Sequence, residues 1–488
     1  MSSVRFNIFS FTGKMKVLHL SWMIFFVSFF VWFNAAPLLK SIQTTFGLSK
    51  AEVSTLLVLN VALTIPARVI IGMLTDRFGP RRVYSSLMVI MSIPCFAFAL
   101  ADSFVQLAIA RFALGAIGAG FVVGIRMVSE WFPHNQLGTA EGIYGGWGNF
   151  GSAAAAFTLP ALALVFGGDE GWRYAIAVSG IMSIFIGIVF YLGVRDTPPG
   201  AIYFKPKNTG AMEITSQVDF FFLVVMKIPM YLALGVLAWR LSPDKLDMLS
   251  QGATNGIYVG LVTLFVYEVY MVWKVNGHVF SQEVPEIQRY SFSQVAVLNV
   301  LYFATFGSEL AVVSMLPLFF ADTFALSPIV AGLLASGYAF MNLMSRPGGG
   351  YLSDRFGRRK TLLILTAGLA LGYFLMSNVT GTWPVALAVV AIMACSFFVQ
   401  AGEGAVFAVV PLIKRSQTGQ IAGMTGAYGN VGAVTYLLIY SMVTPQTFFL
   451  VIAATAVVGF FALLFLKEPS GQIAEIGEDG SVQVIAVS

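Results

Sequence analysis

Charged side chains are scarce in this sequence. Asp, Glu, Lys and Arg together make up 10% of its 488 residues, while 58% of the residues are hydrophobic. Soluble domains have about 25% charged residues, so this composition excludes a soluble globular protein. A chain with a mean hydropathy of +0.82 is expected to cross a lipid bilayer repeatedly.

Cysteine and histidine are also rare. The two cysteines, Cys95 and Cys395, lie in apolar runs without paired spacing, and the three histidines are scattered. These residues predict neither a disulfide framework nor a metal site. A glycine-rich phosphate loop in a strand-turn-helix setting and a large soluble signalling domain are missing as well. We therefore expect no cofactor, and an enzyme or a receptor is disfavoured.

The basic residues indicate membrane topology. The net charge is +5, but Lys and Arg stand in short clusters between apolar runs. This is the pattern of the positive-inside rule, so we expect no nucleic-acid partner. Arg5, Lys14 and Lys16 precede the first apolar run, which places the N-terminus in the cytoplasm. A plasma or inner membrane location follows.

Long apolar runs predict the number of membrane helices. A spanning helix needs about 20 apolar residues. An even number of spans places the C-terminus in the cytoplasm with the N-terminus. We predict fourteen spans: 17–39, 53–75, 83–101, 104–130, 138–166, 173–194, 219–241, 254–274, 294–321, 328–352, 361–379, 383–412, 418–443 and 447–466.

One polar motif occurs twice at a constant offset of 278 residues (346 − 68 = 278). The positions that recur are Arg68, Gly72, Asp76 and Arg77, which match Arg346, Gly350, Asp354 and Arg355. A duplicated motif in apolar surroundings indicates two related halves. The offset leaves room for two helices between them. The predicted domains are a first six-helix bundle in 1–195, a linker with the inserted helices in 196–290, a second bundle in 291–467, and a mobile acidic tail in 468–488.

Two arginines of the repeat lie inside predicted helices. Arg68 and Arg346 each precede a repeated glycine by one helical turn, and no carboxylate lies one turn away on either helix. An arginine within a membrane is costly unless it faces a cavity. Its planar fork of donors suits a small flat oxyanion. The pair therefore predicts an anion site. The alternatives are an arginine that reaches the headgroups or one that pairs with a glutamate on another helix.

A second duplication adds two amides. The segment 145–151 matches 426–432, and its equivalent pairs are Gly145 with Gly426 and Asn149 with Asn430. Close helix packing alone explains such dense glycines, but it does not explain equivalent asparagines. An amide beside bare backbone can donate a hydrogen bond to a desolvated ligand.

The first repeated motif, Gly-x-x-x-Asp-Arg-Phe-Gly, resembles the signature loop of the major facilitator superfamily. The resemblance covers the whole chain and implies an all-α membrane protein, with two six-helix bundles around a cavity that opens alternately to each side. The two inserted helices depart from this pattern. Because its glycines permit close approach and its carboxylates can cap a helix end, we assign this loop to the gate. The predicted gate residues are Gly72, Asp76, Arg77, Gly350, Asp354 and Arg355.

Both motifs together resemble the nitrate signatures of the nitrate/nitrite porter family. The resemblance implies that Arg68 and Arg346 clamp nitrate, with Asn149, Asn430, Gly145 and Gly426 beside it. It also implies aromatic walls, for which ordinary packing is the alternative; the candidates are Tyr302, Phe306, Phe121 and Phe33. Nitrate is the anion of a strong acid, so its recognition requires fixed positive charge, amide donors and flat walls. Nitrite is also small and flat, and the sequence does not separate the two.

Proton coupling requires buried carboxylates. Moving one charge against the membrane potential costs about 2.3 kcal/mol per 100 mV, so uptake driven by that potential needs at least two cations per nitrate. Glu309 and Glu403 lie in predicted helices and are the candidates, because their segments resemble the proton-coupled branch of the family. The alternative is a structural pairing with Arg111 or Arg126. Arg126 is also spaced to pair with Glu130.

We therefore expect a monomeric secondary transporter for nitrate and nitrite that is coupled to protons. One alternative is exchange of nitrate for nitrite, which is electrically neutral and needs no proton. Another is a drug/proton antiporter, which also carries two helices between its halves. The paired arginines argue against a site for a cationic drug.

Overall fold

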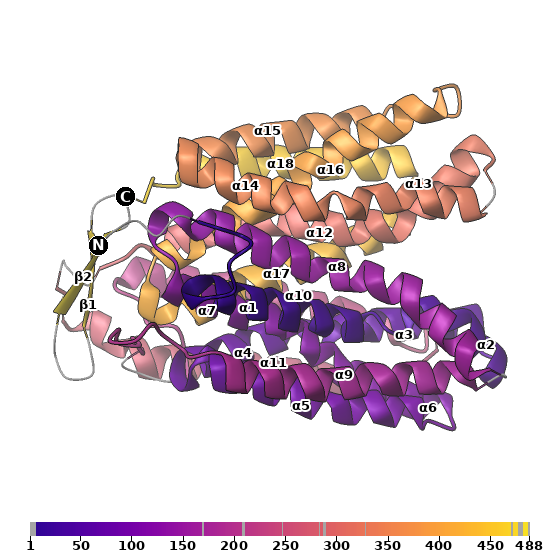
Figure 1. Cartoon of the computed structure of the whole chain (residues 1–488), viewed down its shortest axis with the longest axis horizontal. Coiled ribbons are helices and arrows are strands. Elements are labelled where there is room, and N and C mark those ends of the chain that lie inside the picture. Colours follow the sequence, from indigo (N-terminus) through magenta and orange to yellow (C-terminus); the bar gives the residue numbers. More distant parts are fainter. Residues whose placement is uncertain are drawn as a thin grey trace.

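The computed structural model describes residues 6–167, 170–206, 210–245, 247–282, 284–285, 289–326, 328–469, 472–476 and 482–486. Most helices run side by side along the long axis of the molecule (Figure 1). The first half contains α1 Gly13–Trp32, α2 Leu39–Phe46, α3 Lys50–Ala62, α4 Thr64–Phe78, α5 Pro80–Ala99, α6 Phe104–Leu114, α7 Gly120–Trp131, α8 His134–Phe166 and α9 Gly171–Gly193. Two further helices follow: α10 Gln217–Leu241 and α11 Gln251–Asn276. The second half contains α12 Phe292–Phe324, α13 Pro328–Phe340, α14 Asn342–Phe356, α15 Arg358–Met376, α16 Val385–Phe407, α17 Thr418–Tyr440 and α18 Pro445–Leu463.

Twelve helical segments of the described residues are long and apolar enough to cross a membrane, so the chain is a multi-pass membrane protein. Two of the fourteen predicted spans, 328–352 and 418–443, are not among the twelve. The first is divided into α13 and α14. The second corresponds to α17, which is rich in glycine and buries the polar side chains of Thr418, Gln420, Thr425 and Asn430. Helices surrounded by protein do not need an apolar surface on every side.

The second predicted span of each half is interrupted at an equivalent position. The break between α3 and α4 falls at Leu63, and the break between α13 and α14 falls at Met341, which is 278 residues later. Pro66 contributes to the first break because proline has no N–H for the carbonyl four residues earlier. Arg68 and Arg346 therefore both lie near the start of a new helix, five residues after a break.

The two halves meet along two pairs of helices. α8 packs against α14, and α17 packs against α4. Figure 1 shows α8 and α14 side by side where the purple and orange bundles meet. Glycine makes this approach possible, because a Cβ atom at Gly350 would lie 1.8 Å from the carbonyl oxygen of Gly138. At the equivalent contact, a Cβ atom at Gly72 would lie 2.2 Å from the carbonyl oxygen of Gly419. Only very small residues fit at these crossings.

The inserted helices lie on the outside of the seam between α4 and α17. α10 packs against α17 and α12, whereas α11 packs on α10. Met230 of α10 is buried beside Ile65 of α4 and Ala427 of α17. Tyr428 Oη of α17 donates a hydrogen bond to the carbonyl oxygen of Met226 at 2.6 Å. One inserted helix therefore touches both halves of the protein.

The end of the chain contains two short strands. Residues 472–476 (β1, Gln472–Ile476) and 482–486 (β2, Val482–Ala486) pair as an antiparallel hairpin. The strands lie beyond one end of the helices (Figure 1). Both strands are rich in the β-branched residues valine and isoleucine, which favour strands.

Candidate functional site

Arg68 is an intramembrane cation that is bonded to backbone carbonyls. It is fully buried on α4. Its Nη1 donates to the carbonyl oxygen of Gly426 on α17 at 2.6 Å, and its Nε donates to that of Gly118 at 3.4 Å. These hydrogen bonds orient the guanidinium group but do not neutralise its charge.

Arg346 occupies the equivalent position on α14 but has two carboxylate partners. Its Nη2 lies 3.2 Å from Glu309 Oε2 of α12 and forms a second ion pair with Glu403 of α16. Asn342 and Gln400 donate hydrogen bonds to Glu309. Both predicted coupling residues therefore contact a predicted substrate residue, and their partner is neither Arg111 nor Arg126.

Aromatic rings connect the two arginines. The guanidinium carbons of Arg68 and Arg346 lie 5.1 Å and 5.7 Å from the centre of the Phe306 ring. Tyr302 stacks on Phe306 with ring centres 5.1 Å apart, and Phe121 is nearly parallel to Tyr302 at 6.4 Å. Arg68 also lies 5.5 Å from the centre of Phe121. Three of the four predicted aromatic residues therefore lie together beside the arginines.

The fourth predicted aromatic residue, Phe33, lies elsewhere. It directly follows α1 and contacts Phe29 and Trp32. The ring of α1 that reaches Phe121 is Phe25, two helical turns earlier, at 5.3 Å. Sequence reasoning also missed Phe407, which meets both Phe121 and Tyr302 edge to face. No local pattern separates these rings from the many other phenylalanines of the chain.

The second duplicated motif faces the arginines in a crossed arrangement. A Cβ atom at Gly145 of α8 would lie 3.2 Å from Arg346 Nη1, and one at Gly426 of α17 would lie 3.2 Å from Arg68 Nη1. Each half thus places its glycine helix against the arginine of the other half. The buried side-chain oxygen of Asn149 and both side-chain polar atoms of Asn430 have no hydrogen-bond partner among the described residues.

The repeated aspartates bind backbone N–H groups of helices across the interface. Asp76 accepts hydrogen bonds from the backbone N–H groups of Gly419 and Gln420 on α17, both at 2.8 Å. Asp354 accepts bonds from the N–H groups of Gly138 and Thr139 on α8, at 2.9 and 2.7 Å. Gly419 and Gln420 are the second and third residues of α17, where a carboxylate is stabilised by unpaired N–H groups and by the helix dipole, whereas Gly138 and Thr139 are the fifth and sixth residues of α8. The halves are therefore joined at this end of the molecule.

The repeated arginines of the gate motif do not cross the interface. Arg77 lies over the ring of Phe78, and Arg355 donates to Tyr351 Oη at 2.8 Å. A different arginine links the halves.

Arg415 of the second half lies 3.2 Å from Glu130 of the first. Glu130 also pairs with Arg126 at 2.9 Å, so the expected pairing of these two residues is confirmed. Arg111 instead donates to Asn34 Oδ1 at 3.2 Å.

The loop after α9 covers this end of the first half. Asp196 Oδ1 accepts a hydrogen bond from the backbone N–H of Arg81 at 2.7 Å. Burial raises the pKa of Asp196, and the bond from Arg81 opposes that shift. Burial also raises the pKa of Tyr203, which donates to the carbonyl oxygen of Thr75 at 2.7 Å.

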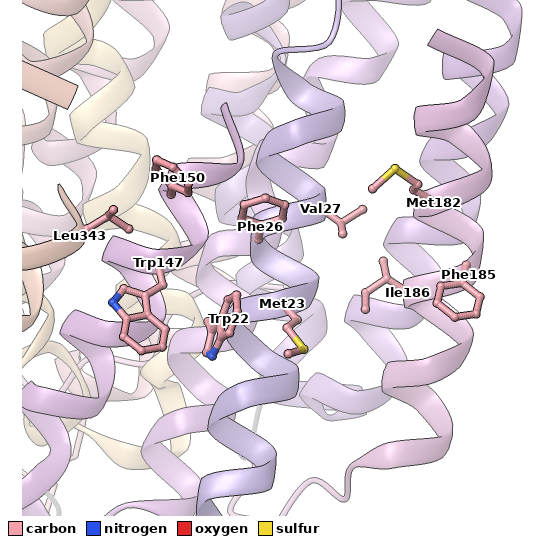
Figure 2. A pocket seen from close by; sticks show the side chains of 10 residues that line it. All are labelled: Trp22, Met23, Phe26, Val27, Trp147, Phe150, Met182, Phe185, Ile186 and Leu343. Carbon is pink, nitrogen blue, oxygen red and sulfur yellow. The ribbon is translucent and has the colours of Figure 1, made fainter. Parts of the chain in front are cut away.

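An apolar groove of about 580 Å³ lies away from these polar groups. Figure 2 shows its lining on three first-half helices, joined by Leu343 of α14. The indoles of Trp22 and Trp147 meet there edge to face at 5.4 Å. The groove offers no charge to an anion, and none of the predicted binding residues lines it.

Two related helical halves, joined through a repeated polar motif around a charged centre, define a transporter of the major facilitator class. The family model of the Major Facilitator Superfamily matches residues 21–275 and 298–486, and the chain belongs to this superfamily of transporters. A solved structure of the proton:xylose symporter XylE has a TM-score of 0.60 with 15% sequence identity, and the match covers 93% of this chain and 96% of that chain. This likeness concerns the fold alone.

Within the superfamily, the chain belongs to the nitrate/nitrite porter family. It is 49% identical over 517 residues to the nitrate/nitrite transporter NrtP of Picosynechococcus sp., a match that covers 97% of this chain and 96% of the relative. It is 45% identical over 476 residues to NrtP of Nostoc punctiforme, which covers 96% and 95% of the two chains.

Proposed function

We propose that this protein carries nitrate and nitrite across the membrane by alternating access at the site between Arg68 and Arg346. The observation that carries the proposal is the position of these duplicated arginines over one aromatic ring, Phe306. The printed names of the two cyanobacterial relatives describe nitrate/nitrite transporters, which supports the same substrate class.

The site provides the chemistry that a small flat anion needs. Arg68 supplies a positive charge whose hydrogen bonds go to backbone carbonyls. The Asn430 amide is buried and lacks a partner among the described residues, so it is free to donate to an oxyanion. Phe121, Tyr302 and Phe306 provide flat walls that exclude water. A cationic drug would meet the charge of Arg68 unfavourably.

A count of charges supports coupling to protons. With both glutamates ionised, Arg346 and Arg68 are balanced by Glu309 and Glu403, and the empty site has no net charge. Nitrate adds one negative charge and competes with the two carboxylates for Arg346. Protonation of both glutamates would then give the loaded site one net positive charge. An inside-negative potential favours its inward movement by about 2.3 kcal/mol per 100 mV.

The remaining assignments follow from the family architecture. We place the gate motifs and both termini on the cytoplasmic side of a plasma or inner membrane. We also count the interrupted helix α13 with α14, and the polar helix α17, as membrane spans, which gives fourteen. The two bundles correspond to residues 1–195 and 291–467, with the inserted helices in 196–290 and a cytoplasmic end in 468–488. The substrate path lies within one chain, so we propose that a monomer is functional.

Exchange of nitrate for nitrite is the second candidate. It is favoured by the ion pairs of Arg346, because glutamates that remain ionised and paired throughout the cycle would make the site indifferent to protons. Exchange of one anion for another is electrically neutral, so it needs neither gradient.

Transport by purified protein in liposomes distinguishes the two mechanisms. An inside-negative potential and an inward proton gradient are imposed separately and together, and nitrate uptake is measured. Symport predicts that both gradients increase uptake. It also predicts that Glu309→Gln and Glu403→Gln abolish accumulation but retain exchange with internal nitrate. Glu170→Gln, which changes an exposed loop residue, is the control.

Three other results would change the assignment. Uptake that ignores both gradients but requires internal nitrite or nitrate would make the protein an exchanger. Uptake that survives in Arg68→Gln at the original affinity would remove Arg68 from the binding site. Absence of nitrate movement under every condition would overturn the substrate assignment.

A further inference from the structure

Glu141 is a buried carboxylate that the transport site does not use. It lies on α8 with a fractional exposure of 2%. Neither of its carboxylate oxygens has a hydrogen-bond partner among the described residues. Other carboxylates in the described interior are held: the buried Asp76 and the partly buried Asp354 by helix N–H groups, Glu309 and Glu403 by Arg346, Glu130 by Arg126, and Asp219 by the N–H group of Phe292 and the hydroxyl group of Ser216.

Glu141 lies between the gate contact and the arginine site. It follows Gly138 and Thr139, whose N–H groups bind Asp354, by less than one helical turn. The next residue, Gly142, packs so closely on α14 that a Cβ atom there would lie 2.4 Å from the carbonyl oxygen of Arg346. Any opening between α8 and α14 must therefore change the surroundings of Glu141.

Charged groups on the helices packed against α8 have other partners. On α14, Arg346 pairs with Glu309 and Glu403. Asp354 of the same helix lies 3.1 Å from Arg358, and its negative charge would repel a charge on Glu141. Tyr144 Oη, one turn along α8, donates to the carbonyl oxygen of Phe121 at 2.9 Å. The remaining groups and their partners are Lys14 with Gln136 and His19 with Trp22 from α1, Arg126 with Glu130 from α7, Arg173 with Glu170 from α9, and Glu403 with Arg346 from α16.

The duplicated contact shows that this carboxylate is not required for packing. Between α4 and α17, Asp76 caps the same backbone positions and Gly72 makes the same close approach. The residue of α17 equivalent to Glu141 is Ala422, at the offset of 281 that relates Asn149 to Asn430. One half thus builds the contact with alanine, and the other places an ionisable group there.

We infer that Glu141 is a proton-binding site, occupied while α8 and α14 are closed and emptied when they separate. An ionised carboxylate without a partner is strongly disfavoured in a dry interior, so the closed contact holds Glu141 as a neutral acid. Opening admits water. The O–H bond then breaks, the proton passes to water on that side, and the carboxylate is left hydrated.

This inference rests on the alternating access of the proposed function but not on nitrate as its substrate. One proton released at each opening would make the gate sensitive to the pH on its own side. With the gate placed in the cytoplasm, an alkaline cytoplasm favours the inward-open state. The transport cycle thereby gains a proton-linked step separate from Glu309 and Glu403.

Distance measurements between spin labels test the inference directly. Labels are placed at Asn135→Cys and Lys360→Cys, two exposed residues at this end of the two halves, after the buried Cys95 and Cys395 are replaced by alanine. The full-length protein is studied between pH 5 and 9. If one proton leaves on opening, the ratio of open to closed molecules depends on pH. Above the pKa that Glu141 has in the open, hydrated state, this ratio should rise by up to tenfold per pH unit. Glu141→Gln and Glu141→Ala remove this slope, with Ala reproducing the residue of the second half.

The possible results are distinct. An unchanged pH dependence in both variants, or no pH dependence in the starting protein, overturns the inference. Comparison of the two variants controls for a packing defect in either one, and each is checked for a single symmetric peak in size-exclusion chromatography. Nitrate counterflow is measured on the same samples. Loss of the pH slope in a protein that carries no nitrate would support the role of Glu141 while the proposed substrate fails.

Discussion

Arg68 and Arg346 occupy equivalent positions of a duplicated motif, but their electrostatic surroundings differ. Arg346 is paired with Glu309 and Glu403, whereas Arg68 is bonded to two backbone carbonyls. The four charges sum to zero when both glutamates are ionised, but among the described residues both carboxylates pair with Arg346 and neither pairs with Arg68. Under the proposed function, an anion can bind Arg68 directly, whereas it can bind Arg346 only in competition with these carboxylates.

Removal of Arg346 should destabilise the protein more than removal of Arg68. Arg346→Met leaves two buried carboxylates without their partner, which costs about 3–5 kcal/mol of unfolding free energy. Arg68→Met loses charge-assisted hydrogen bonds, worth about 1.5–3 kcal/mol each, but also removes a buried charge. The thermal unfolding midpoints in detergent micelles should follow this order. Adding Glu309→Gln and Glu403→Gln to Arg346→Met should restore most of the loss. Equal losses in the two single variants would contradict the asymmetry.

Asn430→Leu should weaken anion binding without destabilising the fold. The Asn430 amide has no hydrogen-bond partner among the described residues, so its removal breaks no hydrogen bond within that part of the chain. We expect the unfolding free energy to stay within about 1 kcal/mol and the nitrate dissociation constant to rise about tenfold, equivalent to about 1.4 kcal/mol. Calorimetric titration and thermal unfolding measure both quantities.

Asn276→Leu is the matched control for this amide. Asn276 is also buried, but it binds the backbone of Ile214 and Met212 at 2.9 and 3.0 Å. Its replacement should lower stability and leave nitrate affinity unchanged. The opposite pattern for the two asparagines would argue against a binding role for Asn430.

Gly350→Ala should open the gate end. The added Cβ atom would lie 1.8 Å from the carbonyl oxygen of Gly138, so α8 and α14 could not keep their present separation. Overpacking of this kind costs about 1–3 kcal/mol, and here the strain falls on the closed state. The measured distance between labels at this end should shift toward open molecules.

Gly348→Ala on the same helix provides the control, because a Cβ atom at Gly348 would have no heavy atom within 4 Å. It should behave like the unmodified protein. A closed gate in Gly350→Ala would show that α8 and α14 need not approach this closely.

The inserted helices should depend on one ion pair. Lys227 Nζ of α10 lies 2.8 Å from Glu268 Oε2 of α11. A single charge left in a membrane helix costs about 2.5–3.5 kcal/mol, so Lys227→Met alone should lower the unfolding midpoint by more than Lys227→Met with Glu268→Gln. Thermal unfolding of these two variants, of Glu268→Gln alone and of the unmodified protein forms a double-mutant cycle. Additive losses would show that the two side chains do not interact.

Repetition made much of the architecture predictable. The two polar motifs recur at offsets of 278 and 281 residues, and each copy identifies the helix that carries it. Helix positions followed from apolar runs, because a membrane demands about 20 such residues per crossing. The same rule predicted one continuous helix over 328–352 and missed its division into α13 and α14, because a break at Met341 does not change the number of apolar residues in the segment.

The sequence by itself thus determined the class of protein and the duplicated motifs that carry its buried arginines. These properties depend on composition and repetition, which can be read from the sequence without knowing how the helices pack. Only the tertiary structure decided that Arg346 binds Glu309 and Glu403, that Phe25 rather than Phe33 reaches Phe121, and that Glu141 is buried without a partner. Such contacts depend on how each helix is rotated and where it crosses its neighbours. A helix rotated by one residue would exchange one ring or carboxylate for another, and nothing in its own sequence records that rotation.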